Sequence, residues 1–283
     1  PLAADATQTR TNPPSTATSQ ALTGRDDATT NAVAPPVARA AVPVRGLQQL
    51  LDSVRQIMKE EQIPGLALSL VHRDSVIWEG GLGLADIEKQ EPVTALHLFR
   101  QGSVSKMLGA LAIMKLAEEG AFSLEDELRM IAPEIAFTNR YELTHPVRVM
   151  HLLEHTAGFD DMHVHALYNF TFNEPSGREM IDRHRQSLNT RWLPGTRHAY
   201  SNSGYVVVTY LIEKFSGRAY DDYIQKTILE PLGMNHSNFT SLPWKEEKYS
   251  SGYKMEKGEL TYVPFRAIVS GVAGTFNSCP QDM

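Results

Sequence analysis

The sequence of 283 residues contains one cysteine, Cys279, so no disulfide bond can form within a single chain. It also lacks the run of about 18 apolar residues that a membrane-spanning helix requires. Positive charge is scarce too, because 27 Lys and Arg stand against 33 Asp and Glu and the formal net charge is −6. Binding to phosphate backbones or anionic lipid needs clustered positive charge, so nucleic acid is not an expected partner.

Apolar residues make up 42% of the chain and charged residues 21%, which suits a packed core and excludes a disordered or fibrous protein. Residues 1–46 are the exception, since more than half of them are Ala, Thr or Pro and none is aromatic, Met or Lys. Such a segment buries too little apolar surface to offset its ordering entropy, and we predict a flexible tail. The chain begins at Pro1 instead of Met, which indicates an upstream segment, such as an export signal, that has been removed or trimmed.

Hydrophobic periodicity predicts both helices and strands in residues 47–283. Apolar residues at three-and-four spacing predict helices at residues 47–58, 103–120, 206–215 and 220–229. Apolar runs separated by a polar turn predict strands at residues 66–72 and 76–82. After residue 245 the composition returns to Gly, Ser, Tyr and Val, which is typical of strands and turns. This order predicts an α/β (α+β) fold in which a mostly helical region interrupts an α/β layer.

The main chemical signal lies in residues 99–106 (FRQGSVSK), where Ser103 precedes Lys106 by three positions at a predicted helix start. This spacing places both side chains on one helix face, one turn apart. A lysine in a site that disfavours its charge can remove the proton of a serine hydroxyl and so activate it as a nucleophile. The N–H groups at a helix N-terminus can also stabilise an oxyanion.

Ser-x-x-Lys is a short pattern that arises by chance, and a second copy occurs at Ser251 and Lys254. That copy precedes glycine and proline instead of an apolar helical stripe, so we favour the first. For Ser103 alone, a helix N-cap followed by a solvated lysine is an equally good interpretation.

The second motif is Tyr200-Ser201-Asn202, the only Tyr-x-Asn in the chain, which precedes a predicted helix. A phenol near a lysine can relay protons, and an asparagine offers a donor and an acceptor to a substrate amide. Taken alone, the motif is better explained as a loop followed by a helix cap at Asn202 or Ser203. The hypothesis of a hydrolase depends on both motifs occurring together.

With these motifs, residues 47–283 resemble the serine β-lactamases of class C and the related DD-peptidases, penicillin-binding proteins and esterases. Four further segments carry the resemblance in the family's order: residues 63–65 (IPG), 152–158 (LLEHTAG), 193–195 (LPG) and 231–234 (PLGM). The resemblance implies a β-lactamase-like sandwich of helices on an antiparallel sheet beside a mostly helical region. It also implies a periplasmic or secreted protein that needs no metal or organic cofactor.

For the site, the resemblance implies that Ser103 becomes acylated, that Lys106 takes its proton and that Tyr200 assists proton transfer to the leaving group. Asn202 would orient the substrate amide and Lys106, and the backbone N–H of Ser103 would be one of two oxyanion donors. The expected substrate is a β-lactam or a D-Ala-D-Ala-type amide. A small ester, or a non-catalytic scaffold of the same fold, is the alternative.

One motif of the family is absent from the sequence: Lys-Thr-Gly or His-x-Gly, on the strand that carries the second oxyanion donor. Residues 271–278 (GVAGTFNS) resemble the glycine-rich turn before that strand. We therefore expect four parts: a flexible tail (1–46), an N-terminal α/β part with the nucleophile helix (47–125), a mostly helical region (126–245), and an incomplete return to the α/β domain (246–283). Loss of an oxyanion donor costs about 10²–10³ in turnover, so this chain is expected to be weakly active or inactive.

A rival hypothesis from another class is a zinc peptidase, because His151, Glu154 and His155 fit the pattern His-x-x-Glu-His. No third ligand can be placed, and residues 156–158 should end the helix just after the second histidine. A second polar cluster contains Asp160, Asp161, His163 and His165, where a His-x-His pair could chelate a metal. Solvated histidines at the rim of a substrate site explain this cluster better.

Overall fold

The structure is a computed structural model that describes residues 45–170, 173–240 and 248–283. The predicted tail at residues 1–46 lies outside the described residues, except for Arg45 and Gly46. The helices are α1 (Leu47–Glu60), α2 (Ser105–Glu118), α3 (Leu128–Ile131), α4 (Val149–Leu153), α5 (Val164–Leu167), α6 (Gly177–His184), α7 (Asn202–Ser216) and α8 (Tyr220–Ile224). The strands are β1 (Gly65–His72), β2 (Ser75–Asp86), β3 (Glu91–Pro92), β4 (Phe99–Arg100), β5 (Gly252–Glu256), β6 (Glu259–Val263) and β7 (Asn277–Ser278). Short turns of other helical types are η1 (Gly102–Val104), η2 (Arg185–Ser187), η3 (Gln225–Leu229, a π-helical turn) and η5 (Gly271–Ala273).

A helix and an antiparallel sheet form the first layer pair. Strands β1, β2 and β3 pair in that order, with β1 and β2 antiparallel along most of their length. The apolar stripe of α1 packs on this sheet, where Leu51 and Met58 meet Leu82 of β2 in a small core. The predicted helix at 47–58 and strands at 66–72 and 76–82 are therefore confirmed, with β2 running on to Asp86.

The larger core lies among the helices and is organised around α7, which packs against α2, α4, α6, α8 and η5. Val206, Val207 and Leu211 of α7 are fully buried because the helix is surrounded on most sides. The approach of α6 to α7 requires a glycine, since a Cβ at Gly177 would lie 2.7 Å from the Cα of Tyr210. The helix predicted at 206–215 is found as α7, which extends beyond it at both ends. The helix predicted at 220–229 is found as α8 followed by the π-helical turn η3.

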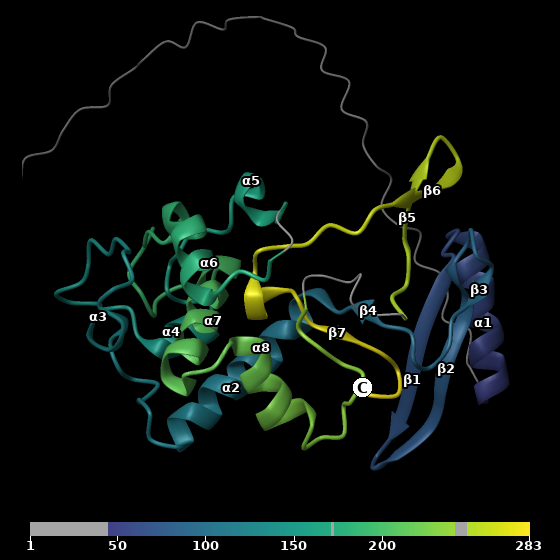
Figure 1. The fold of residues 1–283 in the computed structure, drawn as a ribbon, viewed down its shortest axis with the longest axis horizontal. Helices are drawn as coiled ribbons and strands as arrows, with labels where there is room; N and C mark the ends of the chain where they lie inside the picture. The colour runs from purple at the N-terminus through teal and green to yellow at the C-terminus, as the bar shows by residue number, and fades with distance from the viewer. Residues whose placement is uncertain (1–44, 171–172, 241–247) are drawn as a thin grey trace, which may run out of the picture. The chain divides into compact units, whose positions relative to one another are not determined.

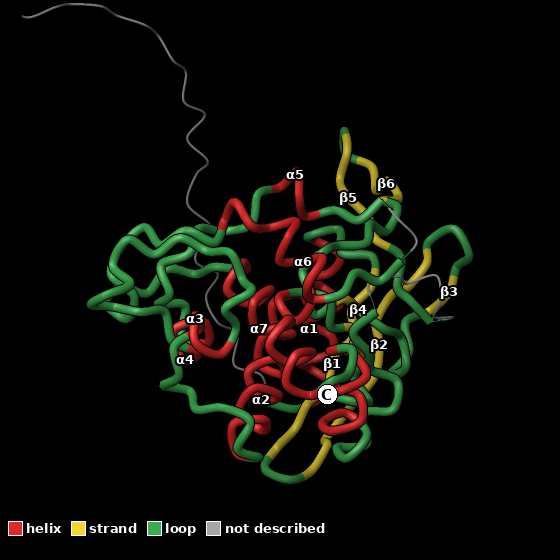
Figure 2. Tube along the Cα trace, turned by 60° about the vertical axis from the view of Figure 1, so that its left-hand side comes forward, coloured by secondary structure: helices red, strands yellow, loops and turns green. Residues whose placement is uncertain are grey.

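Strand β4, which precedes α2, pairs with β7, which lies near the end of the sequence. Phe99 pairs with Ser278, and Arg100 pairs with Asn277. In Figure 1 these two short strands lie between the sheet with α1 and the group of helices around α7. In Figure 2 most of the strands lie to the right of the helices around α7, while α1 and β1 overlap these helices in that view. The mixture of helices and antiparallel strands agrees with the predicted α/β (α+β) class.

The last hairpin, β5 and β6, confirms the predicted return to strand structure after residue 245. Its two-residue loop uses Lys257 and Gly258, both with positive φ, as the twist of a tight hairpin requires. Figures 1 and 2 both show this hairpin projecting from the neighbouring elements. The four-part domain division remains a prediction. Within the described residues, no helix has both the length and the apolar character needed to cross a membrane.

Candidate active site

The Ser103 segment enters the site through a tight turn. Ser103 lies in η1, after Gly102 with φ of +53°, and α2 begins only at Ser105, so the helix starts two residues later than predicted. Ser103 is not the N-cap of α2, because that position is occupied by Val104. The buried Ser105 hydroxyl donates to the Gly102 carbonyl at 2.5 Å and accepts from the Phe276 N–H at 2.9 Å. Ser105 therefore holds the turn that presents Ser103, a role that the sequence did not suggest.

Lys106 is almost completely buried, with 6% of its surface exposed. Its Nζ atom donates to Ser103 Oγ at 3.2 Å, to Asn202 Oδ1 at 2.7 Å and to the backbone oxygen of Ala273 at 2.7 Å. Burial lowers the pKa of the Lys106 ammonium, while Tyr200 and the carboxylate of Asp161 act in the opposite direction. A lysine in this environment loses its proton at a lower pH than a solvated one.

Tyr200 approaches the same serine from the other side. Its hydroxyl lies 2.6 Å from Ser103 Oγ, and either oxygen can be the donor. The ring of Tyr200 lies 4.7 Å from Lys106 Nζ, which is a cation–π distance. Tyr200 is 47% exposed and Ser103 is exposed as well, so solvent and substrates can reach the hydroxyl pair. Ser103 Oγ thus lies within hydrogen-bond distance of a buried lysine and of a phenol.

Asn202 is the first residue of α7, and its side chain is held from two sides. The helix is capped by Ser201, whose hydroxyl accepts from the Gly204 N–H, and not by Asn202 or Ser203 as predicted. Asn202 Oδ1 faces Lys106, and Asn202 Nδ2 donates to the Asp161 carboxylate at 3.1 and 3.3 Å. The backbone N–H of Asn202 donates to Asp161 Oδ1 at 2.8 Å. Asp161 therefore fixes the side-chain amide with its oxygen toward the lysine.

His155 packs against the ring of Tyr200 and binds the backbone of the next residue. The two ring centroids lie 4.5 Å apart, and His155 Nδ1 accepts from the backbone N–H of Ser201 at 3.1 Å. An accepting Nδ1 implies that the ring proton is on Nε2. Burial lowers the pKa of His155, and the charges of Lys106 and His198 lower it further. A neutral imidazole thus holds both Tyr200 and the backbone that follows it.

The zinc hypothesis for His151, Glu154 and His155 is not supported by this geometry. The helix α4 ends at Leu153, and His155 has a φ of +58°, so the two histidines do not share a helix face. His151 Nδ1 accepts from the backbone N–H of Arg148 at 3.1 Å. Among the described residues, these three side chains do not form a group of converging ligand atoms.

The predicted cluster of Asp160, Asp161, His163 and His165 is divided among several contacts. Asp160 Oδ1 forms an ion pair with Arg191 at 3.2 Å, whereas Asp161 belongs to the Asn202 network. The ring centroids of His163 and His165 lie 5.6 Å apart with the ring planes tilted by 49°, and in the described part of the chain the two side chains join no third ligand.

The second Ser-x-x-Lys copy, at Ser251 and Lys254, does not lie on a helix. The Ser251 hydroxyl donates to Asp86 at 3.1 Å, and Lys254 lies on β5 with its Nζ 2.6 Å from Glu256. Serine and lysine therefore contact different partners here. Only the Ser103 copy brings the two side chains of the pattern together.

Comparisons with known proteins found matches over most of the chain. A family model described as Beta-lactamase matches residues 50–283. Penicillin-binding protein 4* of Bacillus subtilis is 28% identical over 84% of this chain and 53% of its own length. A beta-lactamase of Escherichia coli is 29% identical over 83% of this chain and 60% of its own length.

Solved structures with a similar fold were also found. The octameric penicillin-binding protein homologue from Pyrococcus abyssi superposes with a TM-score of 0.70 at 32% identity, over 83% of this chain and 54% of the other. EstCE1, a hydrolase with promiscuous acyltransferase activity, shares the fold with a TM-score of 0.69 at 19% identity, over 83% and 70%. The chain thus spans a little over half the length of the two curated relatives named above.

Proposed function

The chain belongs to the beta-lactamase family of serine hydrolases, and we propose that it forms an acyl-enzyme on Ser103 with β-lactams or with amides of the D-Ala-D-Ala type. The observation that carries the proposal is the position of Ser103 Oγ, 3.2 Å from Lys106 Nζ and 2.6 Å from Tyr200 OH. A serine hydroxyl becomes a useful nucleophile only when a neighbouring base takes its proton.

Lys106 is the proposed base. A neutral amine has two N–H bonds and one lone pair. The acceptors Asn202 Oδ1 and Ala273 O, each at 2.7 Å, hold the two N–H bonds, so the lone pair is left facing Ser103 Oγ. Burial favours this neutral form because it lowers the lysine pKa.

In the first half of the reaction, Ser103 Oγ bonds to the substrate carbonyl carbon while its proton passes to Lys106 Nζ. The C–N bond of the substrate then breaks, and the departing nitrogen receives a proton that Tyr200 OH delivers and Lys106 replaces. In the second half, water gives a proton to the same pair as it bonds to the acyl carbon. The bond between that carbon and Ser103 Oγ then breaks, and Ser103 Oγ takes the proton from the pair. The Ser103 N–H, at a helical N-terminus, is the proposed oxyanion donor.

Asn202 acts in this scheme mainly through the lysine. Its Nδ2 group already donates one hydrogen to the Asp161 carboxylate, so at most one N–H is left for a substrate amide. The preference for amide over ester substrates therefore rests mainly on the family members named above.

Competition labelling tests the proposal. A fluorescent penicillin should label the wild-type chain, label Ser251→Ala equally and leave Ser103→Ala unlabelled. Excess of a D-Ala-D-Ala peptide should reduce the labelling, whereas reduction by p-nitrophenyl acetate alone would favour the ester alternative. Equal labelling of wild type and Ser103→Ala would refute the proposal. We further propose that the protein acts outside the cytoplasm, which fractionation of the natural host would test.

A further inference from the structure

Two segments that lie far apart in the sequence are joined beside the end of β7. Asn238 and Asn277 exchange backbone hydrogen bonds in both directions, at 3.1 and 2.9 Å. Next to them, the hydroxyl groups of Ser237 and Ser278 lie 2.8 Å apart. Asn277 is fully buried, and its side-chain amide donates to three oxygens of the surrounding loops. These contacts fix the backbone from which His236 and Cys279 project.

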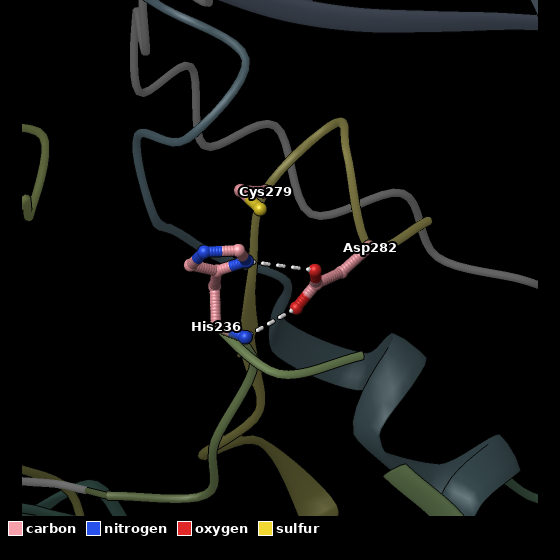
Figure 3. Close-up of side chains that lie close together, drawn as sticks. All are labelled: His236, Cys279 and Asp282. Carbon is pink, nitrogen blue, oxygen red and sulfur yellow. Dashed lines mark hydrogen bonds and ion pairs between the residues drawn. The ribbon is translucent and has the colours of Figure 1, made fainter. Parts of the chain in front are cut away.

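Three side chains with metal-binding atoms converge at this junction, as Figure 3 shows. The ligand atoms of His236, Cys279 and Asp282 all lie within 4.8 Å of one another. They form the one such group among the described residues. The imidazole of His236 is exposed, whereas the thiol of Cys279 is buried and the Asp282 side chain is only 2% exposed. An ion could therefore reach the group from the His236 side.

The donor types are sulfur, nitrogen and oxygen, a combination that suits Zn²⁺ and neighbouring transition metals better than Mg²⁺ or Ca²⁺. Ligand atoms at about 2.0–2.3 Å from a tetrahedral Zn²⁺ lie roughly 3.5 Å from each other. His236 Nδ1 and Asp282 Oδ1 already lie 3.1 Å apart. The exposed imidazole can adjust its rotamer toward the two buried ligands.

Asp282 has the outer contacts of a metal-binding carboxylate. Its Oδ2 atom accepts from the backbone N–H of His236 at 2.8 Å and from the N–H and hydroxyl of Ser237 at 2.6 and 2.7 Å. Oδ2 is thus held by the protein, while Oδ1 points toward His236 and keeps a free lone pair.

We propose that His236 Nδ1, Cys279 Sγ and Asp282 Oδ1 form a binding site for one Zn²⁺, with water as the fourth ligand. On binding, the thiol of Cys279 releases its proton to solvent and becomes a thiolate. The proton on His236 Nδ1 passes through solvent to Nε2 of the same ring, and the hydrogen bond from Nδ1 to Asp282 Oδ1 is replaced by one bond from each atom to the metal. Burial raises the pKa of the Cys279 thiol, and the charge of the ion reverses this effect. The site shares no residue with the Ser103 network.

Metal titration of the chelator-treated full chain tests the site. Co²⁺ should give a thiolate-to-cobalt charge-transfer band in the near ultraviolet that saturates at one ion per chain and disappears when Zn²⁺ is added. Equilibrium dialysis should recover one Zn²⁺ per chain. Cys279→Ser should lose the band, and Cys279→Ser and His236→Gln should each bind Zn²⁺ at least about tenfold more weakly.

The double variant His163→Gln/His165→Gln is the matched control, because it removes the other close pair of imidazoles. It should keep the cobalt band and the zinc stoichiometry. Thermal unfolding by circular dichroism checks that each variant is folded, and Zn²⁺ should raise the Tm of the wild type but not of His236→Gln. The absence of a charge-transfer band, unchanged zinc affinity in folded Cys279→Ser, or loss of binding only in the double variant would overturn the proposal. In that case Asp282 serves only to hold the turn at His236 and Ser237.

Discussion

The amide of Asn202 and the carboxylate of Asp161 are locked together: Asn202 donates its backbone N–H and its Nδ2 group to Asp161 at 2.8, 3.1 and 3.3 Å. This contact decides which way the amide faces, because its oxygen is thereby turned toward Lys106. The geometry of the base is therefore set by a carboxylate that does not touch Ser103.

Asp161→Asn should slow acylation by about 10- to 100-fold, because Asn202 can then rotate and the lysine loses a fixed acceptor. The Asp161 carboxylate also raises the pKa of Lys106, so its removal should move the acid limb of the rate profile to lower pH. Stopped-flow acylation with a chromogenic β-lactam, followed across pH, measures both effects. The control is Asp160→Asn, which changes a surface pair with Arg191 and should leave the profile in place. A lower rate with an unshifted limb would mean that Asp161 is merely structural.

The pH dependence of the wild type should report the buried lysine. Below the pKa of Lys106 the ammonium cannot accept the proton of Ser103, so kcat/KM should fall as the pH decreases through that pKa. Since burial lowers it, the midpoint should lie below the ordinary lysine value of 10.5. Steady-state kinetics in a series of overlapping buffers locates it. A limb that titrates at the ordinary lysine value would show that Lys106 is not the base.

Tyr200→Phe should reduce acylation by about 10²–10⁴-fold, because it removes the hydroxyl 2.6 Å from Ser103 and leaves the ring on His155 in place. Single-turnover kinetics isolates this step. Tyr205→Phe is the matched control, since Tyr205 also faces Lys106 but donates its hydroxyl to the backbone of Leu153. It should keep most of the activity. Equal losses in the two variants would argue against a proton relay through Tyr200.

His184 should make the fold less stable in acid. Its side chain is 2% exposed, and burial lowers its pKa, although the hydrogen bond to Val269 opposes the shift. The unfolded chain takes up this proton near the ordinary value of 6.5, whereas the folded chain does so at lower pH. The free energy of unfolding should therefore fall between these two pKa values as the pH decreases, by up to about 1.4 kcal/mol per pH unit.

Urea unfolding between pH 7 and 5 compares the wild type with His184→Gln, which should show a smaller slope with pH. The exposed His72 on β1 provides the control His72→Gln, which should keep the wild-type slope. Identical slopes in wild type and His184→Gln would exclude a contribution from His184.

The sequence predicted those elements whose pattern is local. The stripe of α1 and the apolar runs of β1 and β2 can each be recognised without knowledge of the rest of the chain. Ser103 and Lys106 were found from their spacing, and Tyr200 and Asn202 from a second motif and the resemblance. The start of α2 was placed two residues early because the turn at Gly102 depends on Ser105 and Phe276, which meet only in the folded chain.

Tertiary contacts explain what the sequence missed. His155 fits a helical zinc motif by spacing, yet its positive φ ends any helix and directs the ring to Tyr200. Asp161 was grouped with its neighbours Asp160 and His163, whereas its partner, Asn202, is 41 positions away. Loops that cross to the start of α7 leave no periodic pattern, so neither role could be derived from spacing alone.

Intact-mass spectrometry after incubation with a penicillin tests the central claim most directly. The wild-type chain should gain the mass of one whole penicillin, as expected for opening of the β-lactam ring by a single nucleophile. Ser251→Ala should gain the same mass, and peptide mapping should place it on Ser103. Ser103→Ala should show none. An adduct of equal yield on Ser103→Ala, or no adduct on the folded wild-type chain, would contradict the assignment of Ser103 as the activated nucleophile.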